Sequence, residues 1–302
     1  MTRKRLAIAV ASAVAAIAVI VGVVVVVSRG EDPAPVVAPE TTTSTTTSTT
    51  APPKGDEYQV ATAKVPKVDV TVIPPAGVTP TPGFEVRPTA MQPIPRTSLN
   101  SAGVRATDLG MQYDNPTYFN NPLIFGVVSV QGDWVEVLLQ ARPNGQVGWV
   151  RKADVDLATY DAKLELDLST KVLTATLDGE VIMETPATIG LDANPTPPGT
   201  YYIFEVIPQS WTGGAFGPFI MATSAYSEEL NLFEGGLPIV ALHGTNEPDT
   251  IGEKASNGCI RIDNDLITVL AEKMPPGVPL IVTEGVAVPV AAPSTAALPQ
   301  AA

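Results

Sequence analysis

The sequence predicts a mainly β protein, in which a β-sandwich domain with one helix follows a smaller β module. Two observations predict this fold class. Short runs rich in β-branched and aromatic residues, bounded by Gly, Pro, Asn and Asp, recur across residues 97–284. Within this region, only the stretch DLITVLAEK at 265–273 favours a helix, which Asp263 and Asn264 can open and the Pro-Pro-Gly at 275–277 ends.

The amino-acid composition excludes several classes of function. The 302 residues include 18 Lys and Arg against 31 Asp and Glu, a net charge of -13, which repels nucleic acid. The single cysteine excludes an internal disulfide and a metal cluster built on several cysteines. The chain also has one histidine, so any Cys/His site must use these two residues.

The N-terminus predicts a membrane anchor. Arg3, Lys4 and Arg5 precede an uncharged apolar run from Leu6 to Val27, long enough to cross a hydrocarbon core about 30 Å thick. The positive-inside rule places the N-terminus in the cytoplasm and the rest of the chain outside the cell. We expect residues 1–30 to form a cytoplasmic stub and a transmembrane helix in the cell membrane. A cleaved signal peptide that releases the protein to the wall is the alternative.

Two segments predict disorder. Residues 31–96 are rich in Pro, Thr and Val, including TTTSTTTSTT at 41–50, and lack the apolar period of a packed element. We interpret this segment as an extended spacer, either stiffened by proline to a set length or a simple tether. The tail at 285–302 is Ala, Pro and Val without a period.

Residues 97–157 predict a small β module. Apolar and polar residues alternate, with turn signals at 131–133 and 143–145. The segments GDWVEV and GWVRKADV, which contain Trp134 and Trp149, resemble the SH3-like β-barrel modules of bacterial cell-wall enzymes. The alternative is a spacer domain that binds nothing, with both tryptophans in its core.

The single cysteine and the single histidine both fall in a second β region, residues 160–284. His243 ends a predicted strand, and Cys259 follows 16 residues later, beyond a polar loop. A thiol needs deprotonation before it attacks, and an imidazole can take its proton and stabilise the thiolate as an ion pair. The preceding Ser256, Asn257 and Gly258 include a permissive glycine that lets backbone N–H groups approach a developing oxyanion.

This pattern resembles the L,D-transpeptidase (YkuD-like) catalytic domain. The signature is a histidine followed about 15 residues later by S-x-G-C-aliphatic-Arg, here His243 and then Ser256 to Arg261. The segments Thr188–Gly190 and Pro197–Ile203 are similar to the strand turn upstream of it, so the resemblance spans about 120 residues. Asn257 departs from the family, which often has histidine there; an amide can donate a hydrogen bond but cannot titrate.

The resemblance implies a mechanism. Cys259 would attack the third residue of a peptidoglycan donor tetrapeptide, with His243 as base and the Gly244 carbonyl orienting the imidazole. Backbone N–H groups of Gly258 and Cys259, with Asn257, would form the oxyanion hole. A stem-peptide amine would then complete a 3→3 cross-link. The resemblance implies no metal or organic cofactor, and it suggests carbapenem-type inhibitors.

Several readings stay open. Ser256 can bond the loop backbone, and Arg261 can pair with Asp263 or a strand carbonyl rather than a substrate carboxylate. Residues 209–236 form a movable flap, or their aromatics Trp211, Phe216 and Phe219 are plain core. The same acyl-enzyme also suits a carboxypeptidase or attachment of a protein amine to the wall. A wall-binding adaptor with an inert cysteine is the non-enzymatic alternative.

Overall fold

The structure is a computed structural model that describes residues 57–84, 105–107, 110–233 and 236–285. The predicted transmembrane helix at 1–30, most of the predicted spacer and all but the first residue of the predicted tail lie outside these ranges. Within the described ranges, no helix is both long and apolar enough to cross a membrane.

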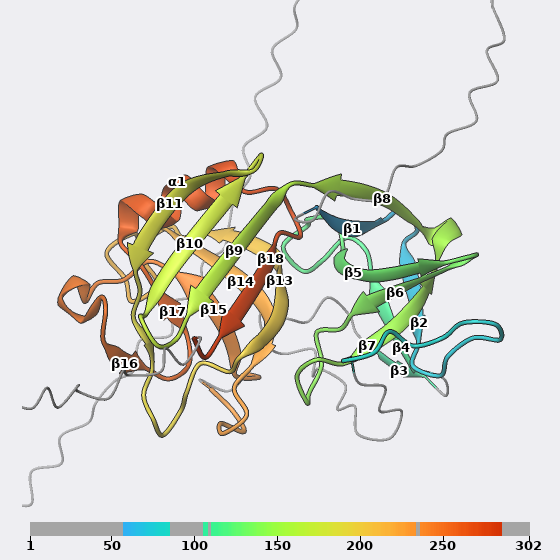
Figure 1. The fold of residues 1–302 in the computed structure, drawn as a ribbon, viewed down its shortest axis with the longest axis horizontal. Helices are drawn as coiled ribbons and strands as arrows, with labels where there is room; N and C mark the ends of the chain where they lie inside the picture. The colour runs from blue at the N-terminus through green and yellow to red at the C-terminus, as the bar shows by residue number, and fades with distance from the viewer. Residues whose placement is uncertain (1–56, 85–104, 108–109, 234–235, 286–302) are drawn as a thin grey trace, which may run out of the picture. The chain divides into compact units, whose positions relative to one another are not determined.

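Eight strands make the first sheet, in the order β3-β4-β2-β7-β6-β5-β1-β8 (Figure 1). A 3-10 turn, η1 (Lys152–Asp154), connects β7 to β8 along the chain. The strands are β1 (Tyr58–Ala63), β2 (Lys67–Thr71), β3 (Arg105–Thr107), β4 (Gly110–Asp114), β5 (Ile124–Gln131), β6 (Trp134–Leu138), β7 (Val147–Arg151) and β8 (Val155–Tyr160).

The predicted disordered spacer is wrong over β1 and β2. β1 pairs antiparallel with both β5 and β8, and β2 pairs with β4 and β7. Val60, Val68 and Val70 from these strands are buried in the core. The segment was missed because its strands are short and lie among prolines, and because their partners come much later in the chain, where sequence period gives no sign of them.

The two predicted turns of this module are confirmed. Gly132, with φ +59°, lies in the link between β5 and β6, and the turn at 143–145 lies between β6 and β7. Trp149 is fully buried, whereas the half-buried Trp134 ring carries the Arg151 guanidinium 4.4 Å from its centre. An SH3-like barrel is not confirmed: the structure shows an eight-stranded sheet that includes strands from before residue 97.

The second sheet has the order β11-β10-β9-β18-β13-β14-β15-β17 (Figure 1). A short parallel pair, β12 (Ile189–Gly190) with β16 (Lys254–Ser256), stands apart from it. The sheet's strands are β9 (Ala162–Asp167), β10 (Val172–Leu177), β11 (Glu180–Pro186), β13 (Gly199–Pro208), β14 (Phe219–Tyr226), β15 (Ile239–His243), β17 (Ile260–Arg261) and β18 (Pro279–Thr283).

Local chemistry explains how this sheet begins. In β9 buried and half-buried residues alternate, as expected for a strand with one face on the core. Asp178 and Gly179, both with positive φ, make the tight two-residue link from β10 to β11. Asp167 accepts hydrogen bonds from the backbone N–H groups of Ser169 and Thr170 and so closes the turn after β9.

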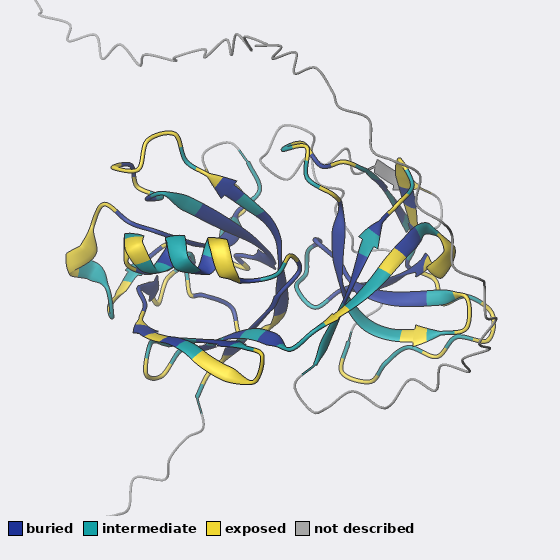
Figure 2. Ribbon diagram, turned by 90° about the horizontal axis from the view of Figure 1, so that it is seen from above, coloured by how far each residue is buried: buried dark blue, intermediate teal, exposed yellow. Residues whose placement is uncertain are grey.

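The predicted helix is confirmed as α1 (Asn264–Lys273). The Asp263 side chain accepts from the Asp265 N–H at 2.8 Å, which caps the first turn. Ile267 and Leu270 are buried, and the outer side of the helix is exposed (Figure 2). The helix packs against β14 and β15, so it buttresses the strand that ends at His243.

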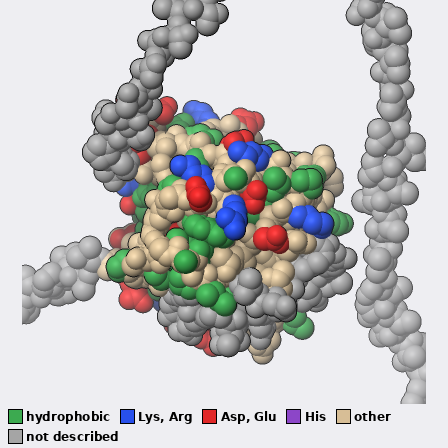
Figure 3. Space-filling model, turned by 90° about the vertical axis from the view of Figure 1, so that its right-hand side faces the viewer, with side chains coloured by type: hydrophobic (Ala, Val, Ile, Leu, Met, Phe, Trp, Pro, Cys, Tyr) green, Lys and Arg blue, Asp and Glu red, His purple; other side chains and the backbone are tan. Residues whose placement is uncertain are grey.

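Charged side chains of both signs are mixed on the surface. Figure 3 shows a face on which Lys and Arg lie among Asp and Glu, with no large patch of one sign on its described part. On the first sheet, Lys64 pairs with Asp156 at 3.2 Å. Exposed pairs of this kind contribute little to stability, so buried apolar side chains carry most of it.

A truncation tests the correction to the spacer. A fragment of residues 57–302 should keep the first sheet, whereas one of residues 90–302 loses β1 and β2. Removing their buried valines and alanines should lower the free energy of unfolding by more than about 5 kcal/mol. Urea unfolding followed by tryptophan fluorescence measures the difference. Equal stability of the two fragments would show that β1 and β2 are dispensable to the fold.

Candidate active site

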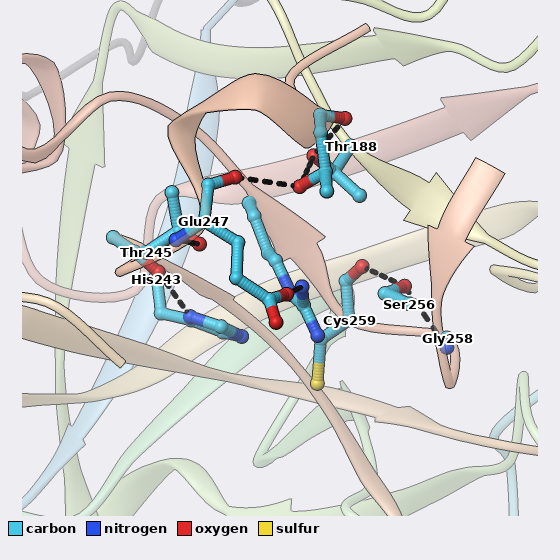
Figure 4. A network of polar contacts seen from close by, with 10 residues as sticks. Thr188, His243, Thr245, Glu247, Ser256, Gly258 and Cys259 are labelled. Atoms are coloured by element: carbon cyan, nitrogen blue, oxygen red, sulfur yellow. Dashed lines mark hydrogen bonds and ion pairs between the residues drawn. The ribbon is translucent and has the colours of Figure 1, made fainter. Parts of the chain in front are cut away.

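Sheet pairing brings the single cysteine and the single histidine together. β15 and β17 run parallel, with Leu242 opposite Ile260 and His243 opposite Arg261. Continuing this register back by one residue puts Cys259 beside Ala241. Because alternate residues of a strand share a face, Cys259 and His243 lie on the same face, diagonally across the pair (Figure 4).

The His243 side chain is buried and held at one nitrogen. Its Nδ1 lies 2.5 Å from the carbonyl oxygen of Gly244. A carbonyl only accepts, so Nδ1 carries the proton and Nε2 keeps its lone pair. Phe216 packs edge-on against the ring, with centres 5.1 Å apart. Burial lowers the pKa of His243 to about 4, although the Gly244 bond opposes the shift.

The Cys259 thiol lies against an apolar wall. Ile207, Ile220 and Ala241 form that wall, and Phe119 and Phe216 pack beside them. The thiol donates to the Ile239 carbonyl at 3.8 Å. Burial raises the pKa of Cys259, while a backbone hydrogen bond and the charge of Arg261 act in the opposite direction.

The ligand-free site therefore favours a neutral thiol and a neutral imidazole. Burial penalises the charged form of each group, which raises the pKa of one and lowers that of the other. Both shifts act against the expected thiolate–imidazolium ion pair before substrate binds. His243 remains competent as a base, because its Nε2 is unprotonated over most of the pH range.

The turn before the thiol is braced by Ser256. This buried side chain donates to the Cys259 carbonyl at 2.6 Å and accepts from the Gly258 N–H at 3.2 Å (Figure 4). Of the two readings for Ser256, the structure shows the backbone-bonding one. The Gly258 N–H, expected in the oxyanion hole, is occupied by this bond. Gly258 has φ +109°, a backbone conformation that L side chains rarely adopt.

Two residues that sequence reasoning did not single out hold the other side of this turn. The Asn194 Nδ2 donates to the exposed Asn257 Oδ1 at 3.0 Å. Thr196 is buried; its hydroxyl donates to the Gly258 carbonyl and accepts from the Gly190 N–H, both at 2.9 Å. Asn194 and Thr196 belong to the loop just before the Pro197–Ile203 segment, but nothing in their local sequence marks a contact more than 60 residues away.

Arg261 pairs with a residue that the sequence did not suggest. Its Nη1 lies 2.8 Å from Glu247 Oε2, rather than near Asp263. Arg261 also exchanges backbone hydrogen bonds with Thr188, in the upstream segment of the motif. Arg261 lies directly opposite His243 in the pairing of β15 with β17, and its charge acts to lower the pKa of both His243 and Cys259.

The three aromatic residues singled out in segment 209–236 differ in their packing. Phe216 packs on His243, Phe219 begins β14, and Trp211 is 74% exposed. Phe119 comes from the first module and packs against the same apolar cluster as Cys259, a contact that no local sequence pattern predicts. Among the described residues, no three His, Cys, Asp or Glu side chains lie close enough together to hold a metal ion.

Sequence comparison finds relatives of the second β region. The family model of the L,D-transpeptidase catalytic domain (YkuD) matches residues 161–282. A Bacillus subtilis (strain 168) protein named as an L,D-transpeptidase, YkuD, is 30% identical over 146 residues, 46% of this chain and 80% of the relative. Its Bacillus licheniformis counterpart is 27% identical over 159 residues, 49% of this chain and 86% of the relative.

Solved structures add weaker similarities. An L,D-transpeptidase from Mycobacterium smegmatis has a TM-score of 0.34 at 19% identity, over 51% of this chain and 79% of that one. L,D-transpeptidase 3 from Mycobacterium tuberculosis has a TM-score of 0.33 at 16% identity, over 47% and 76% of the two chains. Both TM-scores are below 0.5, so the sequence matches are the stronger finding.

Alkylation of the single cysteine tests the neutral resting state. Because burial raises the pKa of Cys259, the rate of reaction with iodoacetamide should reach half its maximum above the ordinary thiol pKa of about 8.5. Replacing Arg261→Gln removes a charge that favours the thiolate and should move the midpoint higher. A midpoint below pH 7 would instead show a preformed ion pair.

The buried histidine also predicts a pH dependence of stability. The unfolded chain binds a proton near pH 6.5, whereas folded His243 does so only near pH 4. The stabilisation is therefore present above pH 6.5 and is lost as the pH falls toward 4, by about 3 kcal/mol. Urea unfolding should show this loss in the wild type and a smaller one in His243→Asn. Parallel pH profiles of the two proteins would contradict it.

Proposed function

The chain belongs to the L,D-transpeptidase (YkuD) family, and from this membership we propose that it forms 3→3 cross-links between peptidoglycan stem peptides. One observation supports the proposal above the others. Cys259 and His243 share a face of the β15–β17 pair, and the Gly244 carbonyl holds the imidazole with Nε2 unprotonated. This is the geometry that a cysteine acyltransferase needs.

In the first half-reaction, Cys259 Sγ attacks the carbonyl carbon of the third residue of a donor tetrapeptide. His243 Nε2 takes the thiol proton as the C–S bond forms, so no stable thiolate is required beforehand. The tetrahedral intermediate then collapses: the C–N bond to the terminal D-Ala breaks, and Nε2 returns the proton to the leaving amine. A thioester on Cys259 remains.

The oxyanion needs hydrogen-bond donors. Because Ser256 engages the Gly258 N–H, we assign this role to the Cys259 N–H and the Asn257 Nδ2. The bond from Asn194 to Asn257 Oδ1 orients that amide so that its Nδ2 is the end able to donate to a ligand.

Arg261 offers a site for the carboxylate of the donor stem. Among the described residues, its buried Nε has no hydrogen-bond partner, while Nη1 pairs with Glu247. A buried donor without a partner is costly, and a ligand oxygen would satisfy it. We therefore assign Arg261 to substrate binding, with Glu247 holding the guanidinium in place.

In the second half-reaction, a side-chain amine of an acceptor stem attacks the thioester. Nε2 takes the amine proton, the C–S bond breaks, and the thiol is restored. Water in place of the amine gives an L,D-carboxypeptidase, and a protein amine gives attachment of that protein to the wall. These alternatives share the acyl-enzyme and differ only in the nucleophile that resolves it.

The rest of the chain extends the proposal. We propose that residues 1–30 anchor the protein in the cell membrane with the catalytic domain outside, on the basis of the basic residues and the apolar run at the N-terminus. The first module would then lie between membrane and catalytic domain and could contact the wall in an SH3-like manner. Protease protection of the N-terminus in intact cells would support this topology.

Product analysis tests the reaction. Residues 57–302 are incubated with disaccharide-tetrapeptide and the products analysed by mass spectrometry, beside a Cys259→Ala control. We expect a cross-linked dimer that has lost one D-Ala, absent from the control. Tripeptide alone would identify a carboxypeptidase. Unchanged substrate in both samples would favour a wall-binding module.

A covalent inhibitor tests the nucleophile separately. A carbapenem should add its mass to the wild-type protein at Cys259, because the β-lactam carbonyl offers the same acyl centre to the thiol. His243→Ala should slow this addition by about 10²-fold, the usual contribution of a general base. An adduct that forms equally fast without His243 would remove the histidine from its assigned role.

A further inference from the structure

We propose that Asn264, at the start of α1, is a positioning residue that sets the tautomer of His243 through the peptide group between Gly244 and Thr245. The effect of Asn264 on catalysis rests on the proposed function. The structural part of the proposal, that Asn264 determines which imidazole nitrogen carries the proton, does not depend on any substrate.

Asn264 and His243 form hydrogen bonds with opposite ends of one peptide group. The Thr245 N–H donates to Asn264 Oδ1 at 2.8 Å, and the carbonyl of the same peptide, that of Gly244, accepts from His243 Nδ1. Hydrogen bonds in series through one amide polarise each other, so each strengthens the other. The Asn264 Nδ2 also donates to the Thr245 carbonyl at 3.0 Å, which fixes the following peptide as well.

Close packing leaves this peptide little room to turn. A Cβ on Gly244 would lie 2.2 Å from Asn264 Oδ1, and one on Gly217 would lie at the same distance. Gly217, with φ +62°, closes segment 209–217 directly against Gly244. Asn264 thus reaches the peptide only because both neighbours are glycines, and it ties the helix, the His243 strand and that segment together.

The helix itself does not require the Asn264 side chain. Asp263 supplies the N-cap through its bond to the Asp265 N–H, and the Asn264 backbone carbonyl accepts from the Thr268 hydroxyl at 2.8 Å. The Asn264 amide instead points at the loop after His243. Asp263→Ala and Asn264→Ala therefore disturb the same helix end, but only the second removes the contact with Thr245.

Losing that contact should change the protonation of the imidazole. Without Asn264, the peptide can rotate and carry the Gly244 carbonyl away from Nδ1. A buried Nδ1–H without an acceptor is unfavourable, so the tautomer with the proton on Nε2 gains population. In that tautomer Nε2 has no lone pair for the thiol proton, and Cys259 loses its base.

The single histidine makes the test direct, because every imidazole nitrogen signal comes from His243. Proton–nitrogen correlation NMR of the full chain, ¹⁵N-labelled and ligand-free, reports the tautomer at pH 7. In the wild type and in Asp263→Ala we expect the proton on Nδ1. In Asn264→Ala we expect the ratio of tautomers to shift toward Nε2–H roughly fivefold, the effect of one lost hydrogen bond. The iodoacetamide reaction of Cys259 should slow by a similar factor.

Asn264→Asp keeps the claim testable if Asn264→Ala does not fold. The aspartate oxygen still accepts from the Thr245 N–H, next to a helix N-terminus that favours its charge, so this variant should keep the proton on Nδ1. A folded Asn264→Asp with the proton on Nε2 would overturn the proposal. So would an unchanged tautomer in Asn264→Ala, or an equal shift in the Asp263→Ala control.

Failure of the proposed function would look different. If the protein makes no cross-linked product yet the tautomer follows Asn264, the positioning claim stands and the reaction assignment falls. If product forms normally in a folded Asn264→Ala whose tautomer is unchanged, the positioning claim falls alone.

Discussion

The parallel pairing of β15 with β17 is the constraint on which the rest of the site depends. It sets Cys259 and His243 on one face and Arg261 directly opposite the histidine. A slip of one residue would turn the thiol to the other face, because side chains alternate along a strand. Parallel strands also need a crossover, and residues 244–259 supply it while carrying Glu247 and the Ser256–Gly258 turn to the site.

Burial then decides the chemistry of that pair. The histidine is almost fully buried and the thiol faces an apolar wall, so both favour their neutral forms. In the acyl transfer that we propose, proton transfer to His243 therefore accompanies formation of the C–S bond. Arg261 lies opposite His243 in the strand pairing, and its charge still favours the thiolate of Cys259 although it is paired with Glu247.

Much of the site was predictable because its chemistry is local in sequence. His243 at a strand end, the turn before Cys259 and the capped helix were all visible as patterns. Three features of the site could not be predicted, because each depends on side-chain geometry that no sequence period encodes. They are the role of Ser256, the hydrogen bond that occupies the Gly258 N–H, and the pairing of Arg261 with Glu247. β1 and β2 were missed for a related reason: short strands among prolines are recognisable only through partners that lie far along the chain.

The sequence by itself determined the class of protein, and with one cysteine and one histidine it left a single candidate Cys/His pair. Only the tertiary structure shows the burial that shifts their pKa values, since desolvation depends on what surrounds a group in space. It also brought Asn264 to the Thr245 N–H after His243, and Phe119 to the apolar cluster against which Cys259 packs. Contacts between segments this far apart arise from the packing of whole elements, which local sequence does not specify.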